Sequence, residues 1–339
     1  MEKDYRNGED LCPEIHYQET AEGVVLTACY GTDGRIFLPD KIEGEPVVAI
    51  APYTFAVSSA SESFSGQAKG EDKIWLSADA RFGGERRRIG ADDVAEVHLP
   101  RFVREIGSYA FYRCRNMQRL SFHDELPSIG GGALTGCRFG EVQVFLHEGE
   151  RSALKSVLDE IRFAIRVKFH KASAACGEER DWELLFPEHY EEAIENTPAR
   201  LLYTSHHGAG GYYRQCFHNR ELDYGKYDAL LPRAIAEEAE ETVTELALLR
   251  LFFPHRLTEA AGSSYEQYIK AHMKTAVELS IDNENAGWLT FLSKNGYWTE
   301  SALDFGIEYA RQRDKTELLG IMMDEKYRRF PAKGKTFLL

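Results

Sequence analysis

One stretch of the chain, residues 203–218, gathers side chains that can do chemistry. Imidazole and thiol groups are ligands that zinc prefers, and this stretch supplies them from His206, His207, Cys216 and His218. Adjacent histidines point to opposite faces of a strand, and neither a CxxC nor an HxxxH spacing is present. We therefore keep an enzyme or zinc-binding site around residues 203–218 as the alternative hypothesis, with these four residues as its metal candidates.

Two further patterns in the same stretch are incomplete. The run His206-His207-Gly208 is similar to the acyl-transfer motif of condensation domains, but that motif needs an aspartate four residues after the second histidine. This chain has Gly211 there. The surrounding glycines match neither of the phosphate-binding patterns GxGxxG and GxxxxGK[ST]. Because a general base needs an orienting partner, we expect no catalytic residue, no cofactor and no enzyme activity. The favoured interpretation is a glycine loop that enters a helix.

The cysteines indicate packing rather than a site. In a reducing compartment, cysteines that are far apart are expected to be free, mostly buried thiols. The chain has six, and none forms a CxxC pair: Cys12, Cys29, Cys114, Cys137, Cys176 and Cys216.

Composition describes a folded protein of about two domains. The chain has 339 residues, of which 43% are hydrophobic and 28% charged, as is usual for globular proteins. Its 41 basic and 55 acidic residues give a net charge of −14. An acidic surface repels phosphate groups, which argues against nucleic acid as a partner. A protein or peptide is the expected partner, and the charge favours a basic one.

No segment of the sequence predicts membrane insertion. The first ten residues are mostly charged or polar, unlike a signal peptide. The longest apolar stretch, Leu246–Phe253, is far shorter than the roughly 20 residues of a membrane span. A cytoplasmic location is therefore expected.

A repeat of 23 residues is the strongest pattern in the chain. Val97 and Leu120 keep this spacing, and so do Ile106 and Ile129. Nine pairs of positions keep it with apolar or small residues, and an earlier copy lies at residues 36–55. The pairs are Val94/Met117, Val97/Leu120, Leu99/Phe122, Val103/Leu126, Ile106/Ile129, Gly107/Gly130, Ala110/Ala133, Phe111/Leu134 and Cys114/Cys137.

The repeat predicts a solenoid. One coil cannot bury its own apolar face, so consecutive coils must stack, and a half-copy at residues 142–146 ends the array. Stacking predicts one ladder from Phe111 and Leu134 and another from Cys114 and Cys137. The thiol ladder could hold a disulfide or a metal ion, although closely stacked coils ordinarily need small buried residues there.

The repeat residues resemble a known family. Three strings are similar to successive segments of the BspA-type leucine-rich repeat: Leu99-Pro100, Ile106-Gly107-Ser108-Tyr109-Ala110-Phe111 and Cys114-Arg115-Asn116-Met117. The resemblance covers about residues 24–146 and is most specific over 94–146. It implies a leucine-rich-repeat β-solenoid in an interaction protein of a kind that is commonly exposed at the cell surface.

Three regions follow from these patterns. Residues 11–150 are expected to form the leucine-rich-repeat domain, with an N-terminal hairpin cap around the turn at 31–34 and an inserted loop at 57–93. Residues 151–180 form a connecting helix and strand, and residues 181–330 form a helical, ankyrin-like domain. The last region resembles the segment that follows such repeats in uncharacterised bacterial leucine-rich-repeat proteins, which have no known activity.

Helical spacing supports the last region. An apolar stripe from Tyr265 to Val277 predicts one amphipathic helix, with Ser264 and Gln267 as a capping box. Leu289 and Leu318 lie 29 residues apart, somewhat less than the 33 residues of an ankyrin repeat.

The sequence thus predicts an α+β protein with a short leucine-rich-repeat β-solenoid followed by an all-helical, repeat-like domain. The function that we expect is a non-enzymatic protein–protein interaction module, because helical and solenoid repeats usually bind partners on rigid stacked elements.

Overall fold

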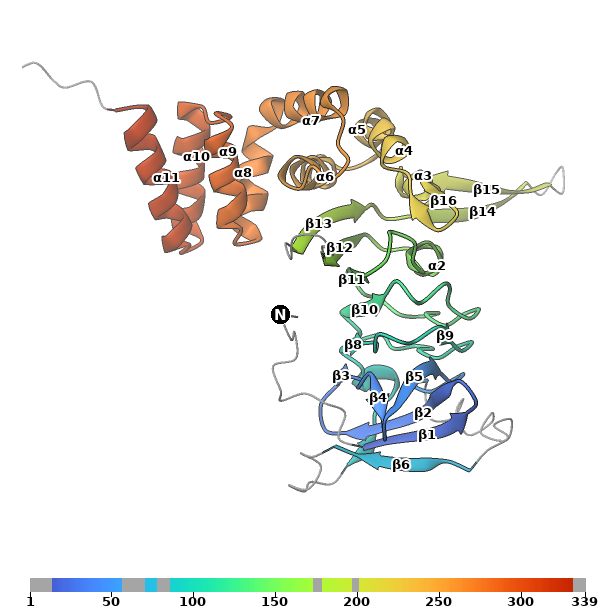
Figure 1. The fold of residues 1–339 in the computed structure, drawn as a ribbon. Coiled ribbons are helices and arrows are strands. Elements are labelled where there is room, and N and C mark those ends of the chain that lie inside the picture. The colour runs from blue at the N-terminus through green and yellow to red at the C-terminus, as the bar shows by residue number, and fades with distance from the viewer. Residues whose placement is uncertain (1–13, 57–70, 78–85, 173–178, 197–200, 332–339) are drawn as a thin grey trace, which may run out of the picture. The chain divides into compact units, whose positions relative to one another are not determined.

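Strands predominate in the first part of the chain and helices in the second, which confirms the expected α+β class with a β-solenoid-like sheet region and a helical region. The protein is seen in a computed structural model (Figure 1). The residues that it describes are 14–56, 71–77, 86–172, 179–196 and 201–331. They fall into two compact units, Met1–Asp223 and Tyr224–Leu339, and each is described by itself.

A six-stranded sheet forms one side of the solenoid. Its strand order is β13-β12-β11-β10-β8-β3, and every neighbouring pair is parallel except β12 and β13. The strands are β3 (Arg35–Phe37), β8 (Glu96–His98), β10 (Arg119–His123), β11 (Glu141–Leu146), β12 (Ile165–Ala172) and β13 (Glu179–Phe186). Val97 pairs with Leu120 in the ladder, so the 23-residue repeat predicted the strand register correctly.

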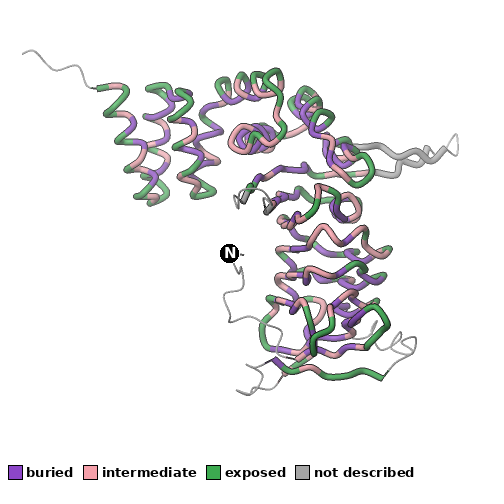
Figure 2. Tube along the Cα trace, viewed as in Figure 1, coloured by how far each residue is buried: buried purple, intermediate pink, exposed green. Residues whose placement is uncertain are grey.

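The inner face of this sheet is a stack of apolar side chains. Strand side chains alternate between the two faces, and Figure 2 shows buried and half-buried residues alternating along these strands. One inner row has no exposed surface at all: Ile36, Val97, Leu120, Val142 and Val167. Full burial of such side chains contributes about 1.5–3 kcal/mol each, so this row is a main source of the solenoid's stability.

A second ladder lies inside the coils and confirms the predicted stacking. The rings of Phe55 and Phe111 are parallel within 5°, with centroids 5.0 Å apart. Cys114 Sγ donates a hydrogen bond to the Phe55 carbonyl at 3.3 Å, and Cys137 Sγ donates to the Phe111 carbonyl at 3.1 Å. The neighbouring Cys137 thiol and burial raise the pKa of Cys114. Both cysteines are free thiols that act as donors between coils.

The repeated glycines allow the coils to approach closely. Gly107 donates its N–H to the Ile50 carbonyl at 2.8 Å, and Gly130 donates to the Ile106 carbonyl at 2.7 Å. A Cβ atom on Gly107 would lie 2.4 Å from the backbone nitrogen of Pro52. Side chains larger than hydrogen are therefore excluded at this step of the repeat.

A second sheet covers the start of the solenoid, and it corrects the predicted hairpin. Strand β2 (Gly23–Gly31) pairs with β1 (Glu14–Thr20) and β5 (Glu45–Ile50), whereas β3 belongs to the other sheet. The turn at 31–34 therefore passes between two sheets instead of closing a hairpin. Strand β5 pairs further with β4 (Lys41–Ile42) and β9 (Glu105–Ile106), which links the cap to the coils.

Two described parts of the inserted segment 57–93 are strands and not loop. Strand β6 (Lys73–Leu76) pairs with β1, and β7 (Arg87–Arg88) pairs with β2. A short 3-10 turn, η3, follows at Ala91–Asp93. The remaining predicted loop residues, 57–70 and 78–85, lie outside the described residues.

The solenoid continues beyond the expected boundary at residue 150. The predicted connection contains a short helix, α2 (Leu154–Glu160), and then β12, which adds a further parallel strand. Strand β13 then pairs antiparallel with β12 and buries Trp182, whose ring stacks on Phe169 at 4.9 Å. The alternation of Trp182 with polar neighbours is a strand pattern that the sequence analysis assigned to helix.

The uninterrupted series of helices does not begin at residue 181, as the sequence analysis expected, but at Tyr224. Strands β14 (Tyr190–Asn196) and β15 (Leu201–His207) form an antiparallel hairpin in between. A short helix, α3 (Gly210–Tyr213), and the pair β16 (Phe217–His218) and β17 (Glu221–Leu222) complete the first unit.

The second unit consists of helices in its described residues, up to 331. In Figure 1, α8 to α11 lie side by side. The helices are α4 (Tyr224–Ala229), α5 (Leu231–Glu237), α6 (Glu240–Phe252), α7 (Glu259–Ala271), α8 (Met273–Asp282), α9 (Ala286–Lys294), α10 (Glu300–Gln312) and α11 (Thr316–Arg329).

The predicted helix at 265–277 is two helices. The stripe residues Tyr265, Ile269 and Val277 are buried as expected, but the helix breaks at His272, between α7 and α8. Residue Thr258 caps α7, in place of the expected capping box. An unbroken apolar spacing does not reveal a break between consecutive helices, because both helices bury the same stripe.

Candidate functional site

The outward face of the six-stranded sheet carries polar and aromatic side chains in rows that cross the strands. Glu96 pairs with Arg119 in the ladder, and Arg119 pairs with Glu141. We call this surface the outer sheet face. It is defined by Arg35, Phe37, Glu96, His98, Arg119, Glu141, Gln143, Phe145, Lys168, His170 and Glu183.

Ion pairs connect four strands of the outer sheet face, β8, β10, β11 and β12. Arg119 lies between two carboxylates, 2.9 Å from Glu96 and 2.7 Å from Glu141. Lys168 lies 3.4 Å from the same Glu141 oxygen. Partial burial raises the pKa of Glu141, but hydrogen bonds from Arg119 and Gln143 outweigh burial and leave this pKa below its ordinary value. The carboxylate is therefore ionised and held in place at neutral pH.

Stacked rings form the rest of this surface. The Phe37 and His98 rings lie 4.0 Å apart and within 9° of parallel. Phe145 stacks between His123 at 5.0 Å and His170 at 4.8 Å. Burial lowers the pKa of His98, which favours its neutral form. Rings that pack on one another keep few rotamers, so the surface is preorganised.

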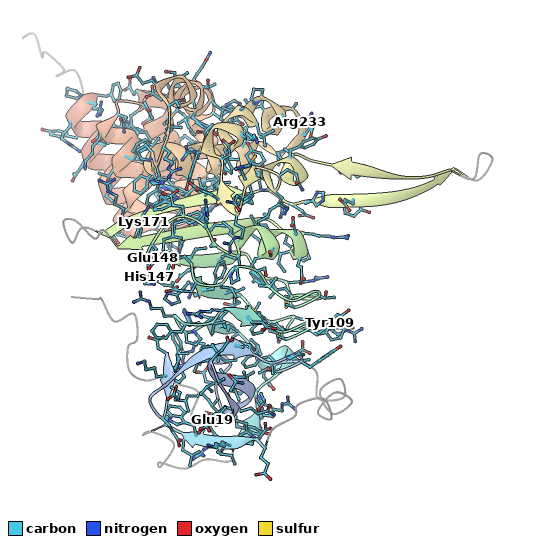
Figure 3. The ribbon with its side chains drawn as sticks, turned by 45° about the vertical axis from the view of Figure 1, so that its right-hand side comes forward. Glu19, Tyr109, His147, Glu148, Lys171 and Arg233 are labelled. Carbon is cyan, nitrogen blue, oxygen red and sulfur yellow. The ribbon has the colours of Figure 1, made fainter. Side chains whose placement is uncertain are left out.

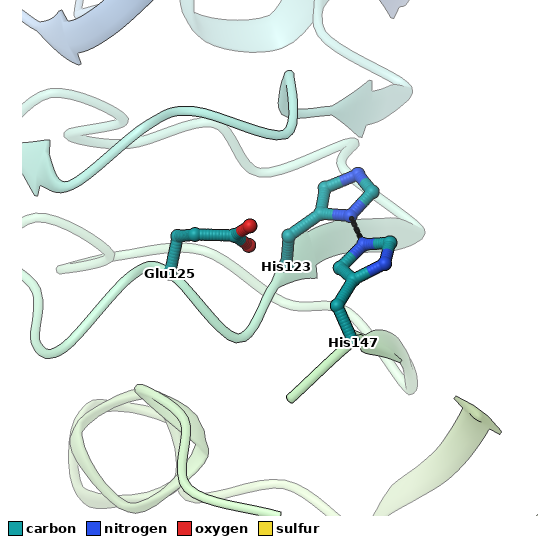
Figure 4. Close-up of side chains that lie close together, drawn as sticks. All are labelled: His123, Glu125 and His147. Atoms are coloured by element: carbon teal, nitrogen blue, oxygen red, sulfur yellow. Dashed lines mark hydrogen bonds between the residues drawn. The ribbon is translucent and has the colours of Figure 1, made fainter. Parts of the chain in front are cut away.

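At one edge of the sheet, two histidines and a glutamate come together (Figure 4). His123 is the last residue of β10, His147 follows β11 directly, and Glu125 lies two residues beyond β10. The two imidazoles share a hydrogen bond of 2.9 Å between His123 Nδ1 and His147 Nε2. One ligand atom from each of the three residues lies within 4.8 Å of the others, and the described residues contain no other such group of three or more metal-binding side chains.

Asp124, in the loop after β10, fixes the loop that follows β11. Asp124 Oδ2 accepts the backbone N–H groups of His147 at 2.7 Å and Glu148 at 2.9 Å. Burial raises the pKa of Asp124. The backbone hydrogen bonds lower it by more than burial raises it, so the pKa lies below its ordinary value. Figure 3 shows His147, Glu148 and Lys171 on one side of the solenoid and Tyr109 on the other.

Only one of the two carboxylate oxygens of Glu125 accepts a hydrogen bond in the structure. Its Oε1 accepts a hydrogen bond from Arg101 Nε at 3.3 Å, whereas its Oε2 is buried and receives no donor. Burial, the neighbouring His147 and Arg101 lower the pKa of His123 to about 4, so its imidazole is neutral at pH 7.

The candidate ligands from residues 203–218 do not form a comparable group in the described structure. His206 and His207 are the last residues of β15, and the His206 side chain lies outside the described residues. His207 and His218 are exposed. Cys216 is buried, and its Sγ donates to the Tyr212 carbonyl at 3.5 Å. Of these four residues, none belongs to a three-ligand group among the described side chains.

The glycines of this stretch enter a helix, as the favoured interpretation held, and they also pack closely against the backbone. They lead into α3, and a Cβ atom on Gly210 would lie 2.1 Å from the Glu188 carbonyl oxygen. Arg214 is buried and donates to the carbonyls of Leu158, Gly210 and Phe163 at 3.1, 3.0 and 2.8 Å. This arginine fixes backbone segments of the first unit to one another.

Sequence reasoning missed the cluster of His123, Glu125 and His147. A signal was present, because each histidine directly follows a buried strand residue, Phe122 or Leu146. Residues that follow the last buried residue of neighbouring parallel strands meet at the same edge of the sheet. The histidines are 24 residues apart, one more than the repeat, so the 23-residue register did not bring them together.

No family model, no curated protein and no solved structure matches this chain.

Within the described residues, no helix has both the length and the apolar character needed to cross a membrane.

Proposed function

We propose that this protein is a non-enzymatic protein–protein interaction module of the BspA-type leucine-rich-repeat kind, which binds its partner on the outer sheet face. The observation that carries the proposal is a continuous ordered surface across six strands, whose charged and aromatic side chains are held by one another. A rigid surface loses little side-chain entropy when a partner binds.

Three glutamates of the outer sheet face make the strongest case for the nature of the partner. Glu96 and Glu141 are positioned by Arg119, and Glu183 lies on β13 beyond Lys168. With the net charge of −14, these carboxylates favour a basic protein segment over an acidic one, and electrostatic steering speeds such an encounter. The same charge makes nucleic acid an unfavourable partner.

Affinity capture with matched charge variants tests this proposal. The face variant changes Glu96, Glu141 and Glu183 to Gln. The control variant changes three carboxylates of the helical unit, the half-buried Glu266 and the exposed Glu300 and Glu317, to Gln. Both variants have a net charge of −14 + 3 = −11. The measurement is the recovery of proteins from a lysate of the native cell, followed by anisotropy titration of a labelled basic peptide from the protein recovered.

We expect the face variant to bind the peptide at least tenfold more weakly than the wild type, and the control to bind like the wild type. The wild-type affinity should also fall between 50 and 300 mM salt because the contact is electrostatic. Equal binding by all three proteins, or loss in the control alone, would refute the outer sheet face as the binding surface. A substrate turned over by the purified chain would refute the non-enzymatic proposal.

A further inference from the structure

The cluster at the sheet edge has the ligands of a metal site. Two imidazoles and one carboxylate are a donor set that zinc uses when it keeps a position open, and a set common to other first-row divalent metals. The structure brings one ligand atom each from His123, Glu125 and His147 within 4.8 Å of the others. In Figure 4 the Glu125 carboxylate points toward the imidazole of His123. We propose that these three residues bind one divalent first-row metal ion, of which Zn²⁺ is the representative.

The ligand geometry needs only a small adjustment. His123 Nδ1 and His147 Nε2 are 2.9 Å apart and share one proton. In tetrahedral zinc sites with Zn–N bonds of about 2.0–2.1 Å, the two nitrogens are about 3.3 Å apart. When a metal takes the place of this hydrogen bond, the donated proton moves to the other nitrogen of the same ring, and side-chain rotation separates the imidazoles by about 0.4 Å. Water completes the coordination.

A buried oxygen of Glu125 that lacks a hydrogen-bond donor also favours a metal ion at this cluster. Glu125 Oε2 is buried and has no hydrogen-bond donor, while Arg101 contacts only Oε1. A buried acceptor that has lost water and gained no donor is unfavourable. A cation at the cluster supplies the missing partner, and it balances the negative charge of the Glu125 carboxylate.

The groups around the ligands hold them for binding. Asp124 fixes the backbone of His147, and the ring of Phe145 stacks on His123. Both histidines are at the ends of neighbouring parallel strands, which are rigid supports. Fixed ligands and outer contacts of this kind tune metal affinity.

Metal titration of the tag-free full-length chain tests this proposal. The protein is treated with a chelator, dialysed and titrated with Co²⁺, whose visible absorption reports tetrahedral coordination, and with Zn²⁺ by calorimetry. The site variants are His147→Ala, His147→Gln and Glu125→Gln. The matched control is His98→Ala, a half-buried histidine on β8 in the same sheet. A second control changes His206, His207 and His218 to Ala and Cys216 to Ser. Circular dichroism checks the fold of each variant.

We expect the wild type to bind one equivalent of metal and to show the Co²⁺ bands of a tetrahedral site. The affinity should fall at least 100-fold in both His147 variants and about tenfold or more in Glu125→Gln, and both controls should bind like the wild type. Wild-type binding weaker than 1 mM, or unchanged binding in a folded His147 variant, overturns the proposal. Loss of binding only in the 206–218 variant assigns the metal to the other stretch and also overturns it.

This inference is independent of partner binding on the outer sheet face. Metal binding is measured without a partner, and the partner test leaves His123, Glu125 and His147 unchanged. The failure of either proposal therefore leaves the other standing.

Discussion

The two units of this protein place their charged groups differently. In the sheet unit, the ion pairs of Arg119 are half-exposed on the outer sheet face, and the buried Arg214 donates its hydrogen bonds to backbone carbonyls. In the helical unit, an ion pair lies in the core: Arg250 is 0% exposed and contacts Asp228 by two hydrogen bonds of 2.8 and 2.9 Å.

The difference follows from how each architecture fixes its register. A solenoid repeats its backbone ladder, so its strands align without a buried ion pair. Helices that pack by apolar stripes can slide, and a buried ion pair is satisfied in one arrangement only. Arg250 on α6 reaches Asp228 on α4, and Tyr265 on α7 donates to the same carboxylate at 3.0 Å. This network fixes the arrangement of three helices.

The largest effect should follow from breaking the buried pair. Arg250→Met leaves the Asp228 carboxylate buried without its cation, which we expect to destabilise the helical unit by about 3–5 kcal/mol. Urea denaturation with hydrogen exchange of α6 measures this loss. The double variant Arg250→Met with Asp228→Leu removes both charges and should recover most of it. A single variant that is as stable as the wild type would show that the pair does not fix the helices.

The sheet unit should also be sensitive at a glycine of the repeat, where two coils approach closely. Gly107→Ala puts a methyl group 2.4 Å from the Pro52 nitrogen, and we expect a loss of about 1–3 kcal/mol from overpacking. Gly131→Ala is the matched control, since nothing lies within 4 Å of the added carbon. Thermal denaturation should separate the two variants clearly. Equal stability would argue against close stacking of the coils at this step.

A helix cap offers a smaller test in the helical unit. The Thr299 hydroxyl accepts the N–H of Ala302 at 3.2 Å and starts α10. Thr299→Ala should destabilise this unit by about 1 kcal/mol, and Thr299→Ser should retain most of the stability. Hydrogen exchange at the first turn of α10 gives the readout. A loss of stability in the sheet unit instead would contradict the assignment of Thr299 as the N-cap of α10.

The smallest effect concerns the surface ion pairs and depends on pH. The folded pKa of Glu141 lies below its ordinary value of 4.5. Its contribution to stability is therefore present above pH 4.5 and is lost as the pH falls through the folded pKa. The wild type should exceed Glu141→Gln by less than about 1 kcal/mol at pH 7, because the pair is partly exposed. Urea titrations from pH 7 to pH 3 should show this difference vanish.

The repeat is the part of the fold that sequence reasoning predicted best. The spacing of Val97 and Leu120 gave the strand register, and the ladders of Phe111 and Cys114 are where stacking put them. Each is a local pattern that recurs, so it can be read without knowing the partner. The hairpin around 31–34 and the helix assigned to the strand with Trp182 were wrong, and the break at His272 was missed, because these features depend on distant segments.

The sequence by itself determined the α+β class, the stacked coils and the buried apolar rows, because period and side-chain volume are encoded locally. Only the tertiary structure decided which polar groups meet. The two histidines of the sheet edge lie 24 residues apart in the sequence, and Arg250 lies 22 residues from Asp228. Side chains at such separations become neighbours through strand pairing and helix packing, since chain geometry alone does not specify which distant residues come into contact.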